Sequence, residues 1–341
     1  MSQTMQRWTM NAIGRENLTF STEAIPTPGR GEVLVRVKAV SLNYRDKIVI
    51  EGAMPLEMPF PFTPTSDMAG VVESIGEDVT RFQPGARVIS TFSPDWIDGK
   101  PNGTARTPPY RTLGGVYQGM LAEYVVMSEN WLVASPESLD DIQASTLPCA
   151  GLTAWFALVE RGGLHAGQSI LVQGTGGVSM FALQIAKAHG AEVFVTSGSN
   201  EKLLRAKALG ADHGINRLED DWVEVIYELT QERGIDHIIE TVGGANLGNS
   251  LRAVAVHGRI SVIGVLEGFD ISGPAGDLIL KSPIIQGVSV GHRRALEDFV
   301  RAIDANGIKP VIETTYKFDE LPQALEHLDR GAFGKIVLTR P

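Results

Sequence analysis

The sequence predicts a two-domain α/β protein, in which a small β-barrel or sandwich accompanies a doubly wound parallel sheet. Three observations support this prediction. The chain has 341 residues, which is long for a single hydrophobic core. Up to about residue 126, short β-type runs are separated by Gly, Pro and Asp turns. From about residue 142 onward, strands alternate with helices.

The first part of the chain contains short runs in which apolar residues alternate with polar ones. Alternation of this kind is typical of half-buried strands in a barrel or sandwich. Residues 93–115 are rich in Pro, Gly and Thr, and they indicate a long surface loop. The predicted strands cover residues 32–38, 67–73, 86–91 and 122–127.

The second part of the chain has the spacing of right-handed strand–helix–strand crossovers. The tail returns to mixed character, with a helix over 293–305 and a strand over 335–338. We therefore assign residues 1–139 and 291–341 to the first domain, and residues 140–290 to an inserted second domain. Strands are predicted at 169–173, 192–196, 236–240 and 259–263, and helices at 177–189, 200–209, 221–232 and 246–255.

Composition excludes several classes of function. Apolar residues make up 43% and charged residues 21%, which is an ordinary globular balance. The formal net charge of −10 and the absence of any Lys/Arg block argue against nucleic-acid binding. No stretch resembles a signal peptide or a membrane span, so we expect a cytoplasmic protein. A single cysteine, Cys149, excludes an intramolecular disulfide framework and every multi-cysteine zinc site.

A glycine-rich turn follows the strand predicted at 169–173 and opens a helix, which is the context of a dinucleotide-binding fingerprint. Gly174 permits the tight turn, and Gly176 allows the backbone to approach a pyrophosphate, which the N-terminus of the helix attracts. Ser179 stands where the fingerprint has Gly or Ala. The alternative is an ordinary glycine-rich turn. The residues expected to contact the dinucleotide here are Gly174, Thr175, Gly176, Gly177 and Val178.

The end of the second strand of this domain indicates which dinucleotide binds. NAD enzymes place an Asp or Glu there to bind the ribose 2′-hydroxyl. This chain has hydroxyl groups and a lysine over 196–202, and these would hold a 2′-phosphate. We therefore expect NADP, bound by Ser197, Lys202 and Arg217. Glu201 argues against this choice, and the basic residues could instead form a solvated helix face.

Several motifs together resemble the zinc-independent branch of the medium-chain dehydrogenase/reductases, which includes quinone oxidoreductases and alcohol dehydrogenase-like proteins. The resemblance implies a GroES-like β-barrel catalytic domain, a Rossmann domain for the cofactor, and an active site in the cleft between the two. The matching segments span nearly the whole chain in the order of the family: 40–46, 70–76, 84–88, 146–154, 170–179, 206–213 and 334–337.

The same resemblance implies that the catalytic metal site is lost. Zinc-dependent relatives have a cysteine at the position of Asn43, a His-Glu pair at Ser66 and Asp67, and a third ligand at Cys149. One thiol cannot supply the three protein ligands of a catalytic zinc. The four-cysteine structural zinc lobe of the relatives would fall near residues 93–115, where no cysteine occurs. We therefore expect no metal, with Cys149 packed in the protein rather than acting as a ligand or nucleophile.

Without a Lewis acid, the substrate must accept a hydride readily or protein donors must replace the metal. Quinones and α,β-unsaturated carbonyls meet this requirement because the added charge delocalises onto an oxygen. We expect Asn43 and Tyr44 to be catalytic donors, although an Asx-type turn with a packed aromatic ring would explain the same pair. Asp46 is expected to be structural, paired with Arg45 or Lys47. The alternatives are a zinc-free alcohol or aldehyde oxidoreductase and a non-catalytic NADPH-binding protein.

The remaining expected cofactor contacts follow from the resemblance. Each of these residues could equally serve only the conformation of a turn. The resemblance also implies a homodimer, formed when the edge strand over 284–290 pairs across a two-fold axis. Small carbonyl or quinone compounds are the expected substrates. The further cofactor-binding residues are Val242, Gly264, Val265, Ser289 and Lys335.

Overall fold

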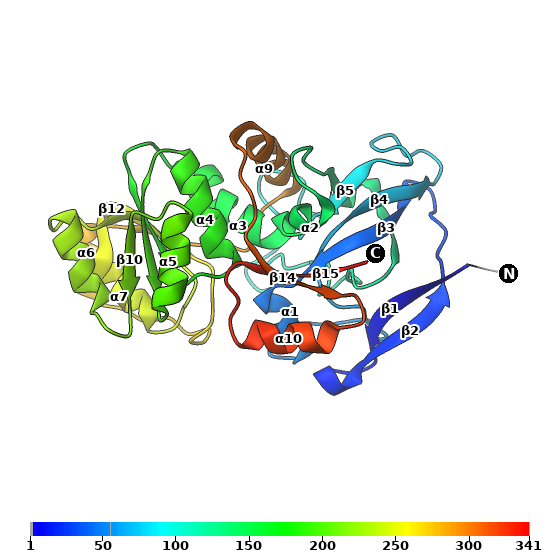
Figure 1. Cartoon of the computed structure of the whole chain (residues 1–341), viewed down its shortest axis with the longest axis horizontal. Helices are drawn as coiled ribbons and strands as arrows, with labels where there is room; N and C mark the ends of the chain where they lie inside the picture. The colour runs from blue at the N-terminus through cyan, green and yellow to red at the C-terminus, as the bar shows by residue number, and fades with distance from the viewer. Residues whose placement is uncertain (1–2, 55, 341) are drawn as a thin grey trace. The chain divides into compact units, whose positions relative to one another are not determined.

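The computed structural model of the chain describes residues 3–54 and 56–340 (Figure 1). It divides into two compact units. Unit 1 contains Met1–Leu152 and Val290–Pro341, and unit 2 contains Thr153–Ser289. The sequence analysis placed the first boundary at residue 139, before a helix at Asp141–Ala144. That helix belongs to unit 1, where the Arg87 guanidinium donates to the Asp141 carboxylate at 2.8 Å and to the Leu139 carbonyl at 2.8 Å.

Unit 1 is built around β3 (Glu32–Ser41), which pairs antiparallel with three strands. These are β4 (Asp67–Ile75), β6 (Tyr124–Ser128) and β15 (Lys335–Thr339). The main strand order of the sheet is β14-β15-β3-β4-β5-β7. The other strands of the sheet are β5 (Arg87–Ser90), β7 (Leu132–Ala134) and β14 (Ile312–Lys317).

The sequence analysis missed an antiparallel hairpin at the start of unit 1. It consists of β1 (Thr4–Met10) and β2 (Leu18–Ala24), which form a separate two-stranded sheet. Every β2 side chain is exposed or half-buried, so the strand lacks the alternation of buried apolar and exposed polar residues that would mark it in the sequence. The short helices of unit 1 include one 3₁₀ turn at Arg15–Asn17, a second at Glu129–Trp131, and a π-helical turn at Leu147–Gly151. Its α-helices are α1 (Tyr44–Ile50), α2 (Asp141–Ala144), α9 (Arg293–Asn306) and α10 (Leu321–Asp329).

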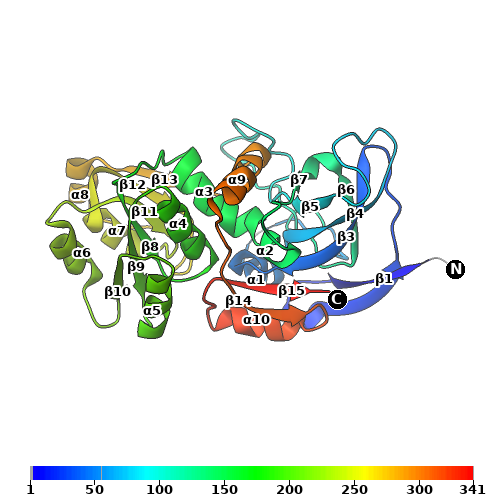
Figure 2. The same ribbon diagram turned by 45° about the horizontal axis from the view of Figure 1, so that its top comes forward.

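Unit 2 contains the predicted doubly wound parallel sheet, in the strand order β10-β9-β8-β11-β12-β13 (Figure 2). Helices α4 and α5 lie to one side of the strands, and α6 and α7 lie to the other (Figure 1). The sequence analysis missed one strand, β10. The strands are β8 (Ser169–Gln173), β9 (Glu192–Ser197), β10 (His213–Asn216), β11 (Ile235–Glu240), β12 (Val254–Val262) and β13 (Ile284–Gly287).

The helices of unit 2 agree with the predicted ones within a few residues at each end. A short helix, α8 (Ala275–Lys281), has no buried residue and was not predicted. None of the helices in the described part of the chain is both long enough and apolar enough to cross a membrane. The other helices are α3 (Leu152–Trp155), a π-helical turn at Phe156–Glu160, α4 (Gly177–Ala188), α5 (Asn200–Ala208), α6 (Trp222–Thr230) and α7 (Asn246–Ala253).

A buried histidine in β11 couples the stability of unit 2 to pH. His237 is 4% exposed, and its Nε2 lies 3.2 Å from Gln168 Oε1. Burial lowers the pKa of His237 from 6.5 to about 4. The unfolded chain therefore binds a proton as the pH falls through 6.5, whereas the native chain does not until the pH nears 4. The free energy of unfolding consequently decreases across this window, by up to roughly 3 kcal/mol from this one group.

We predict that His237→Gln weakens this dependence. Urea denaturation at pH 7 and at pH 4.5 should show a smaller loss of unfolding free energy in the variant than in the wild type. The raised pKa of Asp46 makes the unfolding free energy depend on pH in the opposite direction. This contribution is present in both the wild type and His237→Gln, so it cancels in the comparison. His257→Asn, at an exposed position, is the control and should keep the wild-type slope. Equal slopes for wild type and His237→Gln would contradict the prediction.

Candidate dinucleotide site and donor cluster

The glycine-rich turn after β8 leaves room for a ligand. Gly174 has φ of 74°, a conformation that favours glycine. Gly176 caps α4 without any side-chain hydrogen bond to the first turn of the helix. A Cβ added at either glycine would meet nothing within 4 Å, so packing within the protein does not require these residues to be glycine. The turn therefore fits the pyrophosphate of a dinucleotide, which would occupy this space against the helix N-terminus.

The departure at the third fingerprint position has a structural explanation. Ser179 lies in the first turn of α4 and is 2% exposed. Its hydroxyl donates to the Gln173 carbonyl at the end of β8, at 2.8 Å. This hydrogen bond ties the helix to the strand where a glycine or alanine would only permit close packing. The remaining predicted residues of the turn, Thr175, Gly177 and Val178, lie at the junction of β8 and α4.

The structure brings Ser197 and Arg217 together at the end of β9. Ser197 is buried, and its carbonyl accepts a hydrogen bond from the Arg217 amide at 3.0 Å. A Cβ added at Gly198 would lie 3.6 Å from Arg217 Nη2, which places this guanidinium beside the strand end. Ser199 caps α5 by accepting from the Lys202 amide at 3.3 Å. Hydroxyl groups and positive charge therefore meet at the predicted 2′-phosphate position.

Two acidic residues lie near the same position. Glu201 is exposed in the first turn of α5, where a carboxylate interacts favourably with the helix dipole. The Glu219 carboxylate accepts from the side-chain amides of Asn200 and Asn216, at 2.9 and 2.8 Å. Hydrogen bonds within the protein therefore account for the Glu219 carboxylate, whereas Glu201 is exposed at the N-terminus of α5.

A buried carboxylate that the sequence analysis did not single out holds the turn after β11. Glu240 is fully buried, and its Oε1 accepts from the backbone amides of Val242 at 2.8 Å and Gly243 at 3.0 Å. Its Oε2 accepts from the Asn246 amide at 2.9 Å and from the Ser250 hydroxyl. These donors satisfy the charge without a cation. In the sequence, Glu240 is marked only as an acidic residue at the end of the strand predicted at 236–240.

Val242, Gly264 and Val265 come together in neighbouring turns. A Cβ at Gly243 would lie 2.6 Å from the Gly264 carbonyl and 3.2 Å from Val265 Cα. Gly264 itself approaches the Thr241 carbonyl so closely that a Cβ would lie 1.6 Å from it. Glycine is therefore required here for packing, whether or not a ligand binds. Ser289 is exposed beyond β13 in the same unit.

In unit 1, Asn43 caps α1 and lies in a cluster of buried polar groups. Asn43 is 7% exposed, and its backbone amide donates to the Asp46 carboxylate at 2.8 Å. Asp46 is fully buried and lies 3.5 Å from the Arg45 guanidinium, whereas Lys47 pairs with Asp329. Burial raises the pKa of Asp46 to about 6, against the effect of Arg45. The structural role that we expected for Asp46 therefore combines a helix cap with an ion pair.

Lys335 binds the Asn43 side chain directly. The Lys335 ammonium is 4% exposed and donates to Asn43 Oδ1 at 2.6 Å and to the Leu42 carbonyl. Burial lowers the pKa of Lys335, and the negative charge of Asp67 opposes this shift. Asn43 Nδ2 is buried without a hydrogen bond of good geometry among the described residues. The amide nevertheless lies close enough to Asp67 to lower the pKa of that carboxyl.

Asp67 connects this group to Cys149. Its carboxylate accepts from the Ser66 hydroxyl at 2.6 Å and from the Cys149 backbone amide at 3.0 Å. Burial raises the pKa of Asp67. Burial, followed by the charge of Asp67, also raises the pKa of the Cys149 thiol well above its ordinary value. Cys149 is therefore a neutral thiol at physiological pH, which is unfavourable for a nucleophile.

The cluster of Asn43, Asp46, Asp67, Tyr110, Cys149 and Lys335, together with Arg45, is called the donor cluster below. The structure does not bring Tyr44 into it. Tyr44 is 42% exposed, and its ring lies 5.9 Å from the Lys47 ammonium. The tyrosine in the cluster is Tyr110, whose hydroxyl accepts from Arg45 Nε at 3.3 Å. Sequence reasoning missed Tyr110 because it lies in the 93–115 loop, where no periodic pattern or motif marks it.

The side chains at the expected metal positions do not fit a zinc ion. Asn43 Oδ1 already accepts from an ammonium group, and Ser66 donates to Asp67 instead of offering a free ligand. Within residues 3–54 and 56–340, no group of three or more His, Cys, Asp or Glu side chains is arranged to hold a metal ion. A catalytic zinc needs three such ligands.

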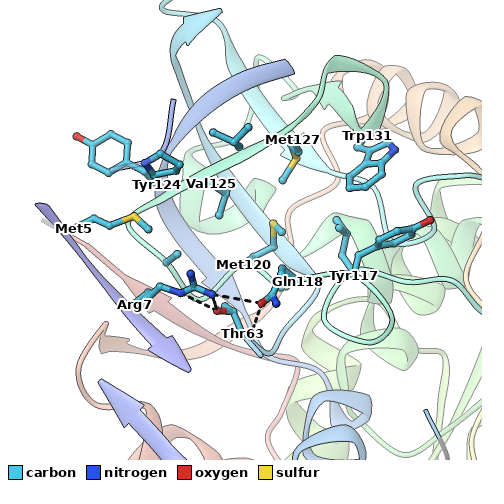
Figure 3. Close-up of a pocket in the computed structure, with 15 residues that line it drawn as sticks. Met5, Arg7, Thr63, Tyr117, Gln118, Met120, Tyr124, Val125, Met127 and Trp131 are labelled. Carbon is cyan, nitrogen blue, oxygen red and sulfur yellow. Dashed lines mark hydrogen bonds between the residues drawn. The ribbon is translucent and has the colours of Figure 1, made fainter. Parts of the chain in front are cut away.

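A separate concavity of about 370 Å³ opens in unit 1 and contains none of the predicted site residues. Figure 3 shows Met5, Met120 and Met127 lining it, with Arg7 at one end. The Arg7 guanidinium donates to Thr63 at 2.5 Å and to Glu23 at 2.9 Å, so its charge is engaged within the protein. The donor cluster is therefore distinct from this mainly apolar concavity.

Comparisons with known proteins agree with this architecture. Residues 29–137 match the alcohol dehydrogenase GroES-like domain, and residues 177–305 match the zinc-binding dehydrogenase model. These matches confirm the predicted fold class, which combines a GroES-like domain with a Rossmann-type parallel sheet.

Relatives and solved structures cover most or all of the chain. A zinc-type alcohol dehydrogenase-like protein of Schizosaccharomyces pombe is 40% identical over 316 residues, 90% of each chain. The quinone oxidoreductase of Rattus norvegicus is 30% identical over 95% of this chain and 94% of its own. A solved structure of a candidate alcohol dehydrogenase from Sinorhizobium meliloti is 63% identical, with a TM-score of 0.97 over 100% of both chains. An NAD-dependent alcohol dehydrogenase is 33% identical, with a TM-score of 0.89 over 99% of this chain and 100% of its own.

The chain therefore belongs to the medium-chain dehydrogenase/reductase family and is an oxidoreductase that uses a nicotinamide dinucleotide.

Proposed function

We propose that this protein is a zinc-independent reductase that transfers a hydride from NADPH to a quinone or an α,β-unsaturated carbonyl. The contact between Lys335 and Asn43 carries this proposal. At the position where the resemblance places a metal ligand, the side-chain oxygen accepts from a buried ammonium group instead. A conjugated acceptor suits a site without a Lewis acid, because its negative charge spreads to an oxygen that hydrogen-bond donors stabilise.

The residues of the chain have distinct roles in this proposal. Gly174 and Gly176 leave space for the pyrophosphate, and the first turn of α4 attracts its charge. Bound nicotinamide supplies the hydride. The donor cluster provides buried positive charge, from Arg45 and Lys335, where negative charge develops on the substrate oxygen. Asp46 and Asp67 hold these cations in place and keep the cluster close to neutral.

The preference for NADP rests on the end of β9. Ser197 and the Arg217 guanidinium lie at this strand end, and Lys202 lies in the first turn of α5. We expect these three residues to contact the 2′-phosphate of NADP. Charge-assisted hydrogen bonds to a phosphate are worth about 1.5–3 kcal/mol each, which corresponds to roughly a tenfold or larger change in affinity.

We predict that Arg217→Ala and Lys202→Ala each raise the Kd for NADPH about tenfold while changing the Kd for NADH less than about twofold. The matched control is Lys207→Ala, which removes the same charge from an exposed position on α5. Isothermal titration of each variant with both nucleotides provides the measurement. If the Kd values for NADPH and NADH rise by the same factor, the assignment of the 2′-phosphate site is wrong.

The substrate class can be tested by NADPH oxidation with 1,4-benzoquinone, a cyclic enone and a primary aldehyde, each with and without EDTA. We expect turnover with the quinone and the enone, little with the aldehyde, and no change on chelation. Loss of activity with EDTA would refute zinc independence. Turnover with the aldehyde alone would favour an alcohol or aldehyde oxidoreductase. Tight NADPH binding with no turnover on any compound would indicate a non-catalytic binding protein.

We also propose that the protein forms a homodimer through the edge of the unit 2 sheet. β13 is the terminal strand of that sheet, and it lies in sequence beside a series of exposed apolar residues. Only Ile284 lies on β13 itself, and the other residues lie on α8 and in the loop before it. An edge strand with exposed apolar residues close by in sequence is typical of a protein–protein interface. The exposed apolar residues are Leu266, Phe269, Ile271, Leu278, Ile279, Leu280 and Ile284.

We predict that Ile279→Glu converts the dimer to a monomer, because it places a charge on an apolar interface. The control is Leu204→Glu, since Leu204 is 69% exposed and Ile279 is 70% exposed. Leu204 lies on α5, which packs against β9 and β10, at the other end of the sheet from β13. Sedimentation equilibrium at micromolar concentration should give a dimer for the control and for the wild type. A monomeric wild type would disprove this assembly.

A further inference from the structure

Tyr110 is held in the donor cluster by Arg45. The Arg45 guanidinium donates through Nε to Tyr110 Oη, at 3.3 Å. Its Nη1 donates to the Leu113 carbonyl at 3.0 Å, and its Nη2 donates to the Thr112 hydroxyl. Three contacts to one short segment fix both the guanidinium and the loop that carries Tyr110.

Aromatic packing restricts the Tyr110 ring as well. The guanidinium carbon of Arg45 lies 5.1 Å from the centre of the Phe92 ring and 5.9 Å from that of Tyr110. The two rings meet edge to face, with their centres 6.3 Å apart. The phenol is therefore positioned before any substrate binds, although it lies in a loop without regular secondary structure.

The hydrogen-bond pattern leaves the phenol proton available. Arg45 has only donors, so the contact uses a lone pair of Tyr110 Oη and not its proton. Among the described residues, Tyr110 Oη has no hydrogen-bond acceptor, and its one hydrogen bond is the one from Arg45. Burial raises the pKa of Tyr110, and Arg45 opposes this shift, so the phenol is protonated at neutral pH. Cys149 and Asp46 lie close enough to raise this pKa further.

We propose that Tyr110 is the catalytic acid of the reduction, donating its phenol proton to the substrate oxygen. As the hydride adds to the conjugated acceptor, two electrons move onto this oxygen. The Tyr110 O–H bond breaks, and a new O–H bond forms on the substrate. The phenolate is held by the Arg45 cation until water returns a proton, which the partial exposure of Tyr110 permits. This inference rests on the proposed function.

Tyr110→Phe provides the test, with Tyr117→Phe as the matched control. Tyr117 lies seven positions later in the chain, and its hydroxyl contacts Asp95 and Arg111 at the surface. With NADPH and the quinone or enone that the wild type reduces, we expect kcat of Tyr110→Phe to fall about 100-fold or more, with KM nearly unchanged. The solvent isotope effect on kcat should change in Tyr110→Phe and remain at the wild-type value in Tyr117→Phe.

A measurement without substrate separates this inference from the proposed function. Burial also raises the pKa of Tyr117, so ultraviolet titration of the free protein should show phenols that ionise above the ordinary range. Tyr110→Phe should remove one of them, and Tyr117→Phe should leave the Tyr110 phenol in place. If the wild type reduces these acceptors and Tyr110→Phe is equally active, Tyr110 is not the acid. If the wild type reduces none of them, the proposed function fails, and this inference fails with it.

A second substitution covers the case in which Tyr110→Phe does not fold. Replacing Tyr110 with 3,5-difluorotyrosine keeps the hydroxyl and nearly the same shape but makes the phenol more acidic. We expect the alkaline limb of the kcat profile to move to lower pH, because the acid form is lost earlier. Arg45, Asp46 and Cys149 influence the pKa of this phenol in wild type and variant alike. An unmoved profile would overturn the proposal.

Discussion

The burial of a lysine ammonium against an asparagine amide is the interaction on which the donor cluster depends. A lysine ammonium has donors only, so the amide of Asn43 must turn its oxygen toward Lys335, at 2.6 Å. A buried cation is costly unless charge and hydrogen bonds offset the loss of water, and here Asp67 and the Leu42 carbonyl do so. Because this pairing joins β15 to the start of α1, the geometry of the cluster is part of the fold of unit 1.

The turns of unit 2 that we propose for the dinucleotide are ordered by a different means, which uses backbone groups and one buried carboxylate. The open space at Gly174 and Gly176 exists before a ligand arrives. The buried Glu240 carboxylate shapes the turn at Val242 and Gly243 through their amides. A turn that is ordered in advance loses less conformational entropy on binding. The conformational entropy of these turns is therefore lost on folding and not on binding.

The chain shares its architecture with a zinc-type alcohol dehydrogenase-like protein, and we propose that its chemistry differs. The region that matches the zinc-binding dehydrogenase model covers residues 177–305, whereas the expected metal positions Asn43, Ser66, Asp67 and Cys149 all lie outside it. A fold can host several reactions because the reacting groups occupy a few positions on a common frame. In this chain those positions hold an amide, a hydroxyl, a carboxylate and a neutral thiol, and a lysine supplies the nearby positive charge.

The fold class, the glycine-rich turn and most strands and helices were predictable from the sequence, because hydrophobic periodicity and turn chemistry are local signals. Asn43 was chosen through the family resemblance, because it stands where zinc-dependent relatives have a ligand. Its contact with Lys335 joins residues 292 positions apart. Tyr44 was chosen because it adjoins Asn43, but α1 leaves it exposed. Tyr110 enters the donor cluster only because a long loop folds back onto Arg45. Such long-range contacts depend on packing and desolvation across the whole unit, and no local pattern of residues encodes them.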